Sequence, residues 1–202
     1  MGMQIKVWDL PTRAAHWLLA GAFVVAFVSA ESERWRLVHV ISGAIVAGAI
    51  VFRLLWGFVG SRYARFADFV TAPRTVVAYL KSTMTGNKRH FVGHNPAGGW
   101  SVLALLAACA LIVGSGLLSY FEMGPRWSGR FHEWVSNGAL ALSALHVLGV
   151  VAGSLLDREN LVRAMITGRK QGDSAAAIAS NRPAALLVLM VICAAAVGAV
   201  TR

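Results

Sequence analysis

The sequence predicts an all-α integral membrane protein, built as a four-helix transmembrane bundle with a fifth transmembrane helix at the C-terminus. Of the 202 residues, 57% are hydrophobic and only 14% are charged, whereas soluble domains average about 45–50% apolar and about 25% charged residues. One small core cannot bury this much apolar side chain. The composition therefore excludes both a water-soluble domain and a disordered chain.

Five apolar runs are long enough to cross the hydrocarbon layer, which takes about 17–25 predominantly apolar residues. The third and fifth runs contain no Asp, Glu, His, Lys or Arg, and the second is interrupted only by His39 at its start and by Arg53. The fourth run holds two histidines and Glu133. The runs occupy residues 14–30, 37–59, 98–121, 131–156 and 184–200.

The formal net charge of +10 indicates how these helices are oriented. Cytoplasmic loops of membrane proteins carry an excess of Lys and Arg, and most of the 19 basic residues flank the runs on the side of the N-terminus. We therefore expect a cytoplasmic N-terminus and a C-terminus on the outer side. The basic charge is then a topology signal in a lipid-embedded protein, and nucleic-acid binding is not needed to explain it.

Four histidines lie within or at the ends of the apolar runs, where ionisable side chains are rare and usually functional. His16 opens the first run near the cytoplasmic side, while His39 and His132 open the second and fourth runs near the outer side. His146 follows His132 by 14 residues, which places it about 21 Å deeper on nearly the same helix face. The fourth helix therefore presents one imidazole at each of two depths.

Each depth has one partner from another helix, so we expect His39 to face His132 and His16 to face His146. Opposed neutral imidazoles are the ligands of six-coordinate haem iron, with the porphyrin held between helices. The pattern predicts two b-type haems, which are non-covalent because the chain has no CxxCH segment. A haem-free membrane anchor or transporter with structural histidines is the alternative of another class.

Arg53 follows His39 by the same 14-residue spacing, which predicts that it faces inward at the depth of the inner histidine pair. A buried guanidinium needs an anion there, and a haem propionate would supply one. Pairing with Asp68, or a position at the surface, is the alternative. Arg13, on the same side of the membrane, is a second candidate for cofactor contact.

Two cytoplasmic segments predict short helices. Pro73 opens the first, whereas Asp157 is expected to cap the second and Gly168 to end it. The tract 171–180, which is polar and rich in alanine, is expected to be mobile.

Four motifs carry a resemblance to a known family. They are VWDLPTRAAHW at the start, RLLWGFVGSRYARF after the second run, GHNPAGGW before the third and DRENLVRAMITGRK after the fourth. Together they resemble the prokaryotic cytochrome b561 family, which includes the b-type cytochrome subunits of nickel–iron hydrogenases. The resemblance covers residues 4–170.

The resemblance implies a four-helix core that holds two bis-histidine haems and transfers electrons across the bacterial inner membrane in a reaction linked to quinone. The haem ligands that it implies are His16, His39, His132 and His146. Residues 1–170 are then the dihaem cytochrome b domain, and residues 171–202 are a polar linker and a C-terminal transmembrane helix.

The favoured interpretation is an electron-transfer subunit between the quinone pool and a periplasmic redox protein, such as a hydrogenase or a cytochrome c. Histidine on both sides of each iron leaves no open coordination position, which favours an electron wire over a catalyst. A stand-alone quinone oxidoreductase that acts on a small substrate such as superoxide is the alternative with the same fold.

The quinone is expected to bind on the cytoplasmic side, at the level of the inner haem, where its headgroup needs hydrogen-bond donors. His94, Asn95 and Trp100 lie there, around the start of the third run, and are the candidate contacts. A solvated loop histidine is the alternative interpretation of His94, and Arg53 and Arg13 are further candidates for the quinone.

Overall fold

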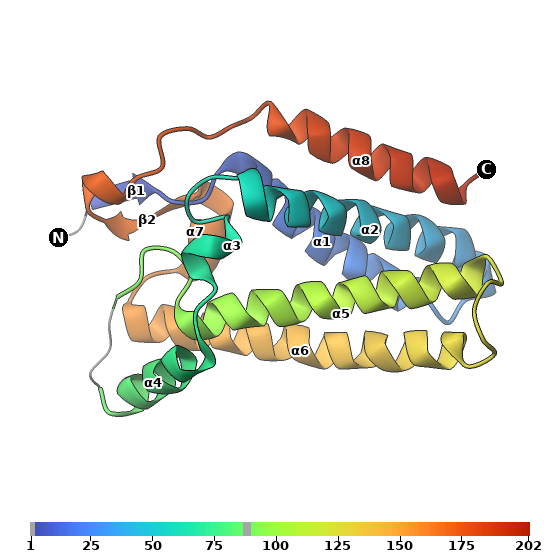
Figure 1. Ribbon diagram of the computed structural model, residues 1–202, viewed down its shortest axis with the longest axis horizontal. Helices are drawn as coiled ribbons and strands as arrows, with labels where there is room; N and C mark the ends of the chain where they lie inside the picture. The colour runs from blue at the N-terminus through green and yellow to red at the C-terminus, as the bar shows by residue number, and fades with distance from the viewer. Residues whose placement is uncertain (1–2, 87–89) are drawn as a thin grey trace.

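The computed structural model describes residues 3–86 and 90–202, in which long helices run side by side and a small cap closes one end (Figure 1). Four of the helices are long and apolar enough to cross a membrane. They correspond to the first four apolar runs of the sequence. They are α1 (Leu10–Ser29), α2 (Arg36–Val59), α5 (Pro96–Tyr120) and α6 (Ser128–Asp157).

The helices pack in pairs, with α1 along α2 and α5 along α6, and α2 joins the pairs by contacting α5. A buried cluster of Ala22, Val46, Ile50 and Cys109 lies where α1, α2 and α5 meet. By contrast, α6 packs mainly on α5 and makes little contact with α1 and α2. The histidine-bearing face of α6 is therefore not filled by side chains of the first two helices.

The expected fifth span is the helix α8 (Ala185–Val200), which has 16 residues and is about 24 Å long. It lies along α2 on the outside of the bundle (Figure 1). The backbone of Cys193 approaches Gly48 so closely that an added Cβ on Gly48 would lie 2.7 Å from the Cα of Cys193. Because α8 is shorter than the other four helices, its crossing of the membrane stays a prediction.

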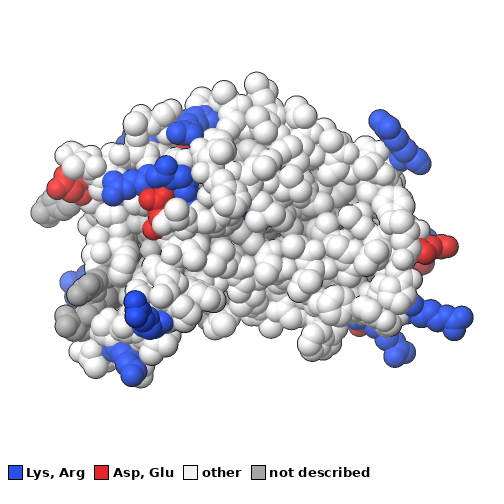
Figure 2. Space-filling view, viewed as in Figure 1, with Lys and Arg blue, Asp and Glu red and all other residues white. Residues whose placement is uncertain are grey.

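Charged side chains gather at the two ends of the molecule in Figure 2, and the surface between them in this view carries none. The uncharged belt coincides with the long helices of Figure 1. This distribution is the one expected of a chain whose middle lies in hydrocarbon and whose ends lie in the headgroup layers.

A small antiparallel sheet joins the N-terminal segment of the chain to the segment that follows α7. Strand β1 (Met3–Lys6) pairs with β2 (Arg169–Gly172), and the backbone N–H of Val7 donates to the carbonyl of Gly168 at 2.8 Å. The sheet is a departure from an all-α chain. Strand β2 also crosses the domain boundary expected at residue 170. The prediction that the tract 171–180 is mobile is wrong for Gln171 and Gly172, which pair with β1.

The short helices surround this sheet and include one correction. Helix α7 (Leu161–Thr167) is capped by Asn160, whose Oδ1 accepts a hydrogen bond from the N–H of Arg163 at 2.7 Å. The predicted cap, Asp157, is instead the last residue of α6. Gly168 ends α7 with φ of 79°, as expected. The remaining elements are η1 (Glu33–Trp35), α3 (Phe66–Phe69), α4 (Pro73–Met84), which Pro73 opens as predicted, and η2 (Ser174–Ala176).

Candidate functional site

The outer histidine pair joins α2 to α6. The ring centroids of His39 and His132 lie 6.0 Å apart, with the ring planes at 83°. The Nδ1 atom of His39 is 2.8 Å from the carbonyl oxygen of Ala26, and that of His132 is 2.9 Å from the carbonyl oxygen of Ile112. A carbonyl only accepts, so each Nδ1 carries the proton and each Nε2 keeps its lone pair for a metal.

The geometry of the outer pair fits a haem iron. An iron that binds one nitrogen of each ring at about 2 Å separates the ring centres by about 6 Å, which matches the observed distance. Gly43, one turn after His39, is half-buried, yet a Cβ added there would have no heavy atom within 4 Å. There is thus room for a flat group beside the ring.

The inner histidine pair lies at the cap end and is held differently. His16 on α1 and His146 on α6 are close enough to interact electrostatically. The Nδ1 atom of His146 is 3.1 Å from the hydroxyl oxygen of Ser101. The Nδ1 atom of His16 is buried without a hydrogen-bond partner, and its ring meets the edge of Trp17 with centroids 4.9 Å apart.

Arg53 is buried on α2 at the same end as the inner pair. Its guanidinium carbon lies 5.1 Å from the ring centre of Phe66 and 5.8 Å from that of Phe69. Its Nη1 atom is buried without a hydrogen-bond partner. The carboxylate of Asp68 accepts from Arg65 at 2.8 Å, so it is engaged elsewhere. The buried carboxylate of Asp9 is close enough to interact electrostatically with Arg53, but the unmet Nη1 donor still favours a further anionic group beside it.

Arg13 serves the cap. Its guanidinium donates to the carbonyl of Ile166, and the indole N–H of Trp17 donates to the carbonyl of Met165 at 3.3 Å. Both bonds satisfy carbonyls at the C-terminal turn of α7, where a positive charge is also favourable. These bonds fasten α1 to α7. The Nε of Arg13 is buried without a hydrogen-bond partner among the described residues, and its contact with a cofactor stays a prediction.

His94 lies between aromatic rings at the cap end, just before α5. Its ring centroid is 4.7 Å from that of Trp8 and 4.9 Å from that of Phe69. Burial, followed by the nearby charge of Arg53, lowers the pKa of His94 to about 3. The imidazole is therefore neutral at physiological pH and has both a donor and an acceptor nitrogen.

Asn95 and Trp100 hold the local backbone. The Oδ1 of Asn95 accepts from the N–H of Gly98 at 2.7 Å and thereby caps α5. The indole N–H of Trp100 donates to the carbonyl of Thr71 at 3.0 Å. His94 lies near Arg53 and the inner pair, whereas the Oδ1 of Asn95 and the indole N–H of Trp100 are engaged by backbone groups. Quinone contacts of Asn95 and Trp100 stay predictions.

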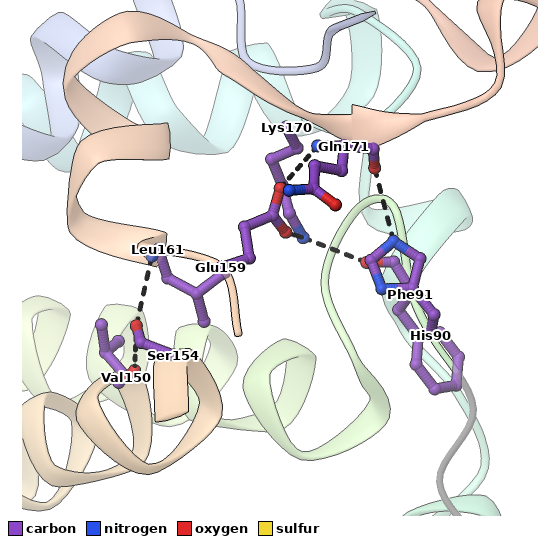
Figure 3. A network of polar contacts seen from close by, with 8 residues as sticks. All are labelled: His90, Phe91, Val150, Ser154, Glu159, Leu161, Lys170 and Gln171. Carbon is purple, nitrogen blue, oxygen red and sulfur yellow. Dashed lines mark hydrogen bonds and ion pairs between the residues drawn. The ribbon is translucent and has the colours of Figure 1, made fainter. Parts of the chain in front are cut away.

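A buried ion pair, which sequence reasoning missed, fastens the segment that carries His94. The ammonium of Lys170 lies 3.5 Å from Oε2 of Glu159 and donates to the carbonyl of Phe91 at 3.0 Å (Figure 3). The Oε1 of Glu159 accepts from the backbone N–H of Gln171 at 2.5 Å. Burial lowers the pKa of Lys170, and the carboxylate of Glu159 opposes that shift. Both residues belong to the DRENLVRAMITGRK motif, but no periodicity marks them as partners.

The first motif also contains a buried carboxylate that the sequence analysis did not single out. Asp9 is fully buried. Its Oδ1 accepts from the N–H of Thr12 at 2.8 Å and caps α1, while its Oδ2 accepts from the indole of Trp56 at 3.1 Å. Asp before a helix that has Pro in its first turn is a recognisable start signal.

Four apolar helices of membrane-spanning length define a multi-pass membrane protein, and two of them bring His39 and His132 together. No group of three or more His, Cys, Asp or Glu within the described residues could hold a bare metal ion. The family model described as prokaryotic cytochrome b561 matches residues 7–168. The chain therefore belongs to the prokaryotic cytochrome b561 family, and is a membrane cytochrome b that takes part in electron transport.

Two relatives with the name of a hydrogenase cytochrome subunit agree with this assignment, and a third relative has another name. A probable Ni/Fe-hydrogenase B-type cytochrome subunit from Bradyrhizobium diazoefficiens is 21% identical and aligns over 83% of this chain and 86% of its own length. One of the same name from Azotobacter vinelandii is 26% identical over 65% of this chain and 66% of its own. A 3-dehydroquinate synthase from Shewanella loihica is 27% identical but is covered over only 31% of its length. No solved structure matches.

Proposed function

We propose that the protein carries electrons across the bacterial inner membrane through two bis-histidine haems b, with the N-terminus in the cytoplasm and the C-terminus in the periplasm. The observation that carries this proposal is that α6 bears His132 and His146 at two depths, each near a histidine of another helix. Two redox centres would divide the crossing into short steps. Residues 1–170 would form the dihaem unit, and residues 171–202 would add the linker and α8.

The haem irons would supply one-electron chemistry, and the protein would set their environment. His39 and His132 would hold the outer haem with rings oriented by backbone carbonyls. His16 and His146 would hold the inner haem, with Ser101 orienting His146. Arg53 would neutralise an inner propionate through the buried donor that has no partner among the described residues.

The quinone end of the path would lie at the cap, where His94 is close to Arg53 and to the inner pair. A quinone that gains electrons also takes up protons, so its headgroup needs a donor there. The neutral imidazole of His94 can donate one hydrogen bond and accept another. Its aromatic neighbours, Trp8 and Phe69, fit a planar ring system.

The other end of the path would face a periplasmic redox protein. The relatives named as hydrogenase cytochrome subunits support a partner of that kind. Exposed charged side chains lie at the outer end, where such a protein would dock next to the outer haem. Glu122 and Arg126 are in the connection between α5 and α6, and Arg130 is in the first turn of α6.

The experiment is electron transfer into sealed vesicles. Protein in liposomes that contain trapped ferricyanide is mixed with external dithionite, and the loss of ferricyanide colour is followed. We expect fast reduction with the wild type and with the exposed control His90→Ala, and a rate near that of empty liposomes with His146→Ala. Equal rates in wild type and His146→Ala would contradict a path through the inner pair.

A further inference from the structure

A pocket of about 660 Å³ lies at the cap end of the bundle, lined by the turn 158–160 after α6, by α7, by β2 and by Gln4 of β1. Its lining includes three arginines, Arg158, Arg163 and Arg169, and we call it the arginine pocket. Its volume is within the range of small-molecule sites. Neither the haem path nor the quinone site uses it.

The arginine pocket is positively charged because its acidic lining residue is already neutralised. The carboxylate of Glu159 is turned to the ammonium of Lys170 and to the backbone N–H of Gln171 (Figure 3). Asn160 in the lining accepts from the N–H of Arg163. The three guanidinium groups, which are exposed, therefore offer their donors to an anion from outside the chain.

Exposed apolar side chains lie next in the chain to the residues of the arginine pocket, although they do not line it. Leu155 and Leu156, at the end of α6, are 75% and 57% exposed and come just before Arg158. Val162 on α7 is also exposed, whereas Ile166 lines a separate apolar pocket against α1. A ligand that suits this place has an anionic head for the arginines and an apolar body beside the exposed end of α6.

Arg158 occupies a position where its backbone favours another residue. It follows the last residue of α6 with φ of 51° and ψ of 35°, the left-handed conformation that helix ends usually give to glycine. Arginine at this position adopts a conformation that L-residues disfavour, but it places a guanidinium in the lining of the pocket.

We propose that the arginine pocket binds the phosphate of an anionic phospholipid headgroup, such as phosphatidylglycerol, from the adjacent leaflet. The planar guanidinium fork matches phosphate oxygens, and basic pockets beside membrane helices suit anionic headgroups. The flanking apolar side chains favour a lipid over a free phosphate ion. The site is independent of the proposed electron path, and either can fail without the other.

The test is lipid titration of the delipidated protein in neutral detergent, read as thermal stability. Dioleoyl phosphatidylglycerol should raise the melting temperature, whereas dioleoyl phosphatidylcholine and inorganic phosphate should not. Each arginine removed should weaken the apparent affinity for phosphatidylglycerol about fivefold, since each contributes about 1 kcal/mol near an anionic surface. The double variant Arg163→Gln/Arg169→Gln should then bind about 30-fold more weakly.

Two variants separate binding from folding. Arg158→Gly removes a guanidinium while placing the favoured residue at a left-handed position, so its stability without lipid should be maintained while its lipid affinity falls. Arg74→Gln, an exposed arginine on α4 outside the pocket, changes the charge equally and should alter the affinity less than twofold. Equal weakening by Arg74→Gln, equal stabilisation by phosphatidylcholine, or stabilisation by inorganic phosphate alone would each overturn the assignment.

Discussion

The outer and inner histidine pairs contain the same residues but differ in how the protein holds them. At the outer end, both Nδ1 atoms meet backbone carbonyls, at His39 and at His132. At the inner end, the Nδ1 of His146 meets the hydroxyl of Ser101, and within the described part of the chain the Nδ1 of His16 has no hydrogen-bond partner. Carbonyls fix a tautomer and a ring orientation, so the outer site is set by the backbone.

The inner pair is instead surrounded by charged and polar side chains. Arg53 and His94 lie close to it, whereas the outer pair is near the end of α1 and the middle of α5. The contrast suggests a division of labour, in which the outer site is built for a fixed electronic environment. The inner site is open to adjustment by neighbouring groups, and the proposed exchange of protons with a quinone would require this.

The largest effects should come from removing a ligand at one level. His132→Ala should leave the inner haem in place, and His146→Ala should leave the outer haem in place, because the two sites share no ligand. Haem extracted per chain should fall from two to one in each variant. Loss of both haems from a variant that stays monodisperse on size-exclusion chromatography would contradict independent sites.

Acidification should destabilise the inner end through His94. The pKa of His94 is 6.5 in the unfolded chain and about 3 in the folded protein, so the unfolded chain takes up a proton at a higher pH. Stability from this group is therefore complete above 6.5 and is lost as the pH falls, by up to about 1.4 kcal/mol per pH unit. The charged or titratable neighbours are Arg53, Lys170, His16 and His146.

Thermal melts between pH 7 and pH 4.5 measure this dependence. His94→Gln should flatten part of the slope, and His90→Gln, which changes an exposed histidine, should leave it as in the wild type. Identical slopes in His94→Gln and wild type would show that His94 is not the group that titrates.

Replacement of Arg53 should change the reduction potential of the inner haem and leave that of the outer haem unchanged. Arg53→Gln removes a positive charge that favours the reduced form, so the inner potential should fall on the order of 60 mV, a tenfold change in a one-electron equilibrium. Arg53→Lys should restore most of it. A redox titration resolves the two centres, and the outer one serves as the internal control. Equal shifts of both would remove Arg53 from the inner site.

The smallest effect should come from the serine hydroxyls. Ser101→Ala removes the hydrogen bond to His146, whereas Ser115→Ala removes a 3.3 Å contact to His132 that the carbonyl of Ile112 duplicates. The potential of the inner haem should therefore shift more in Ser101→Ala than the outer one does in Ser115→Ala. The reverse order would contradict the contrast between the two ends.

Sequence periodicity was sufficient for the four long apolar helices, whereas the membrane depth of the four histidines stays a prediction. The close approach of His39 and His132 was expected because both open their apolar runs at the same end of the bundle. Arg53 could be placed by its 14-residue interval from His39. These inferences depend only on helix geometry, because a long apolar segment that crosses a membrane satisfies its backbone by forming a helix.

The cap was not predictable in the same way. Met3–Lys6 and Arg169–Gly172 form a sheet of four-residue strands, too short to show an alternating pattern and far apart in the chain. The partnership of Lys170 with Glu159, and the choice of Asn160 over Asp157 as a helix cap, depend on how the turn after α6 folds. Tertiary contacts decide such details.

The proposed function requires that two haems lie between the paired histidines. A dithionite-reduced minus oxidised absorption spectrum of the purified protein, with extractable haem counted per chain, tests it most directly. We expect two non-covalent haems b per chain with low-spin spectra. A single haem, or none, in protein expressed with haem available would contradict the account of the two histidine pairs.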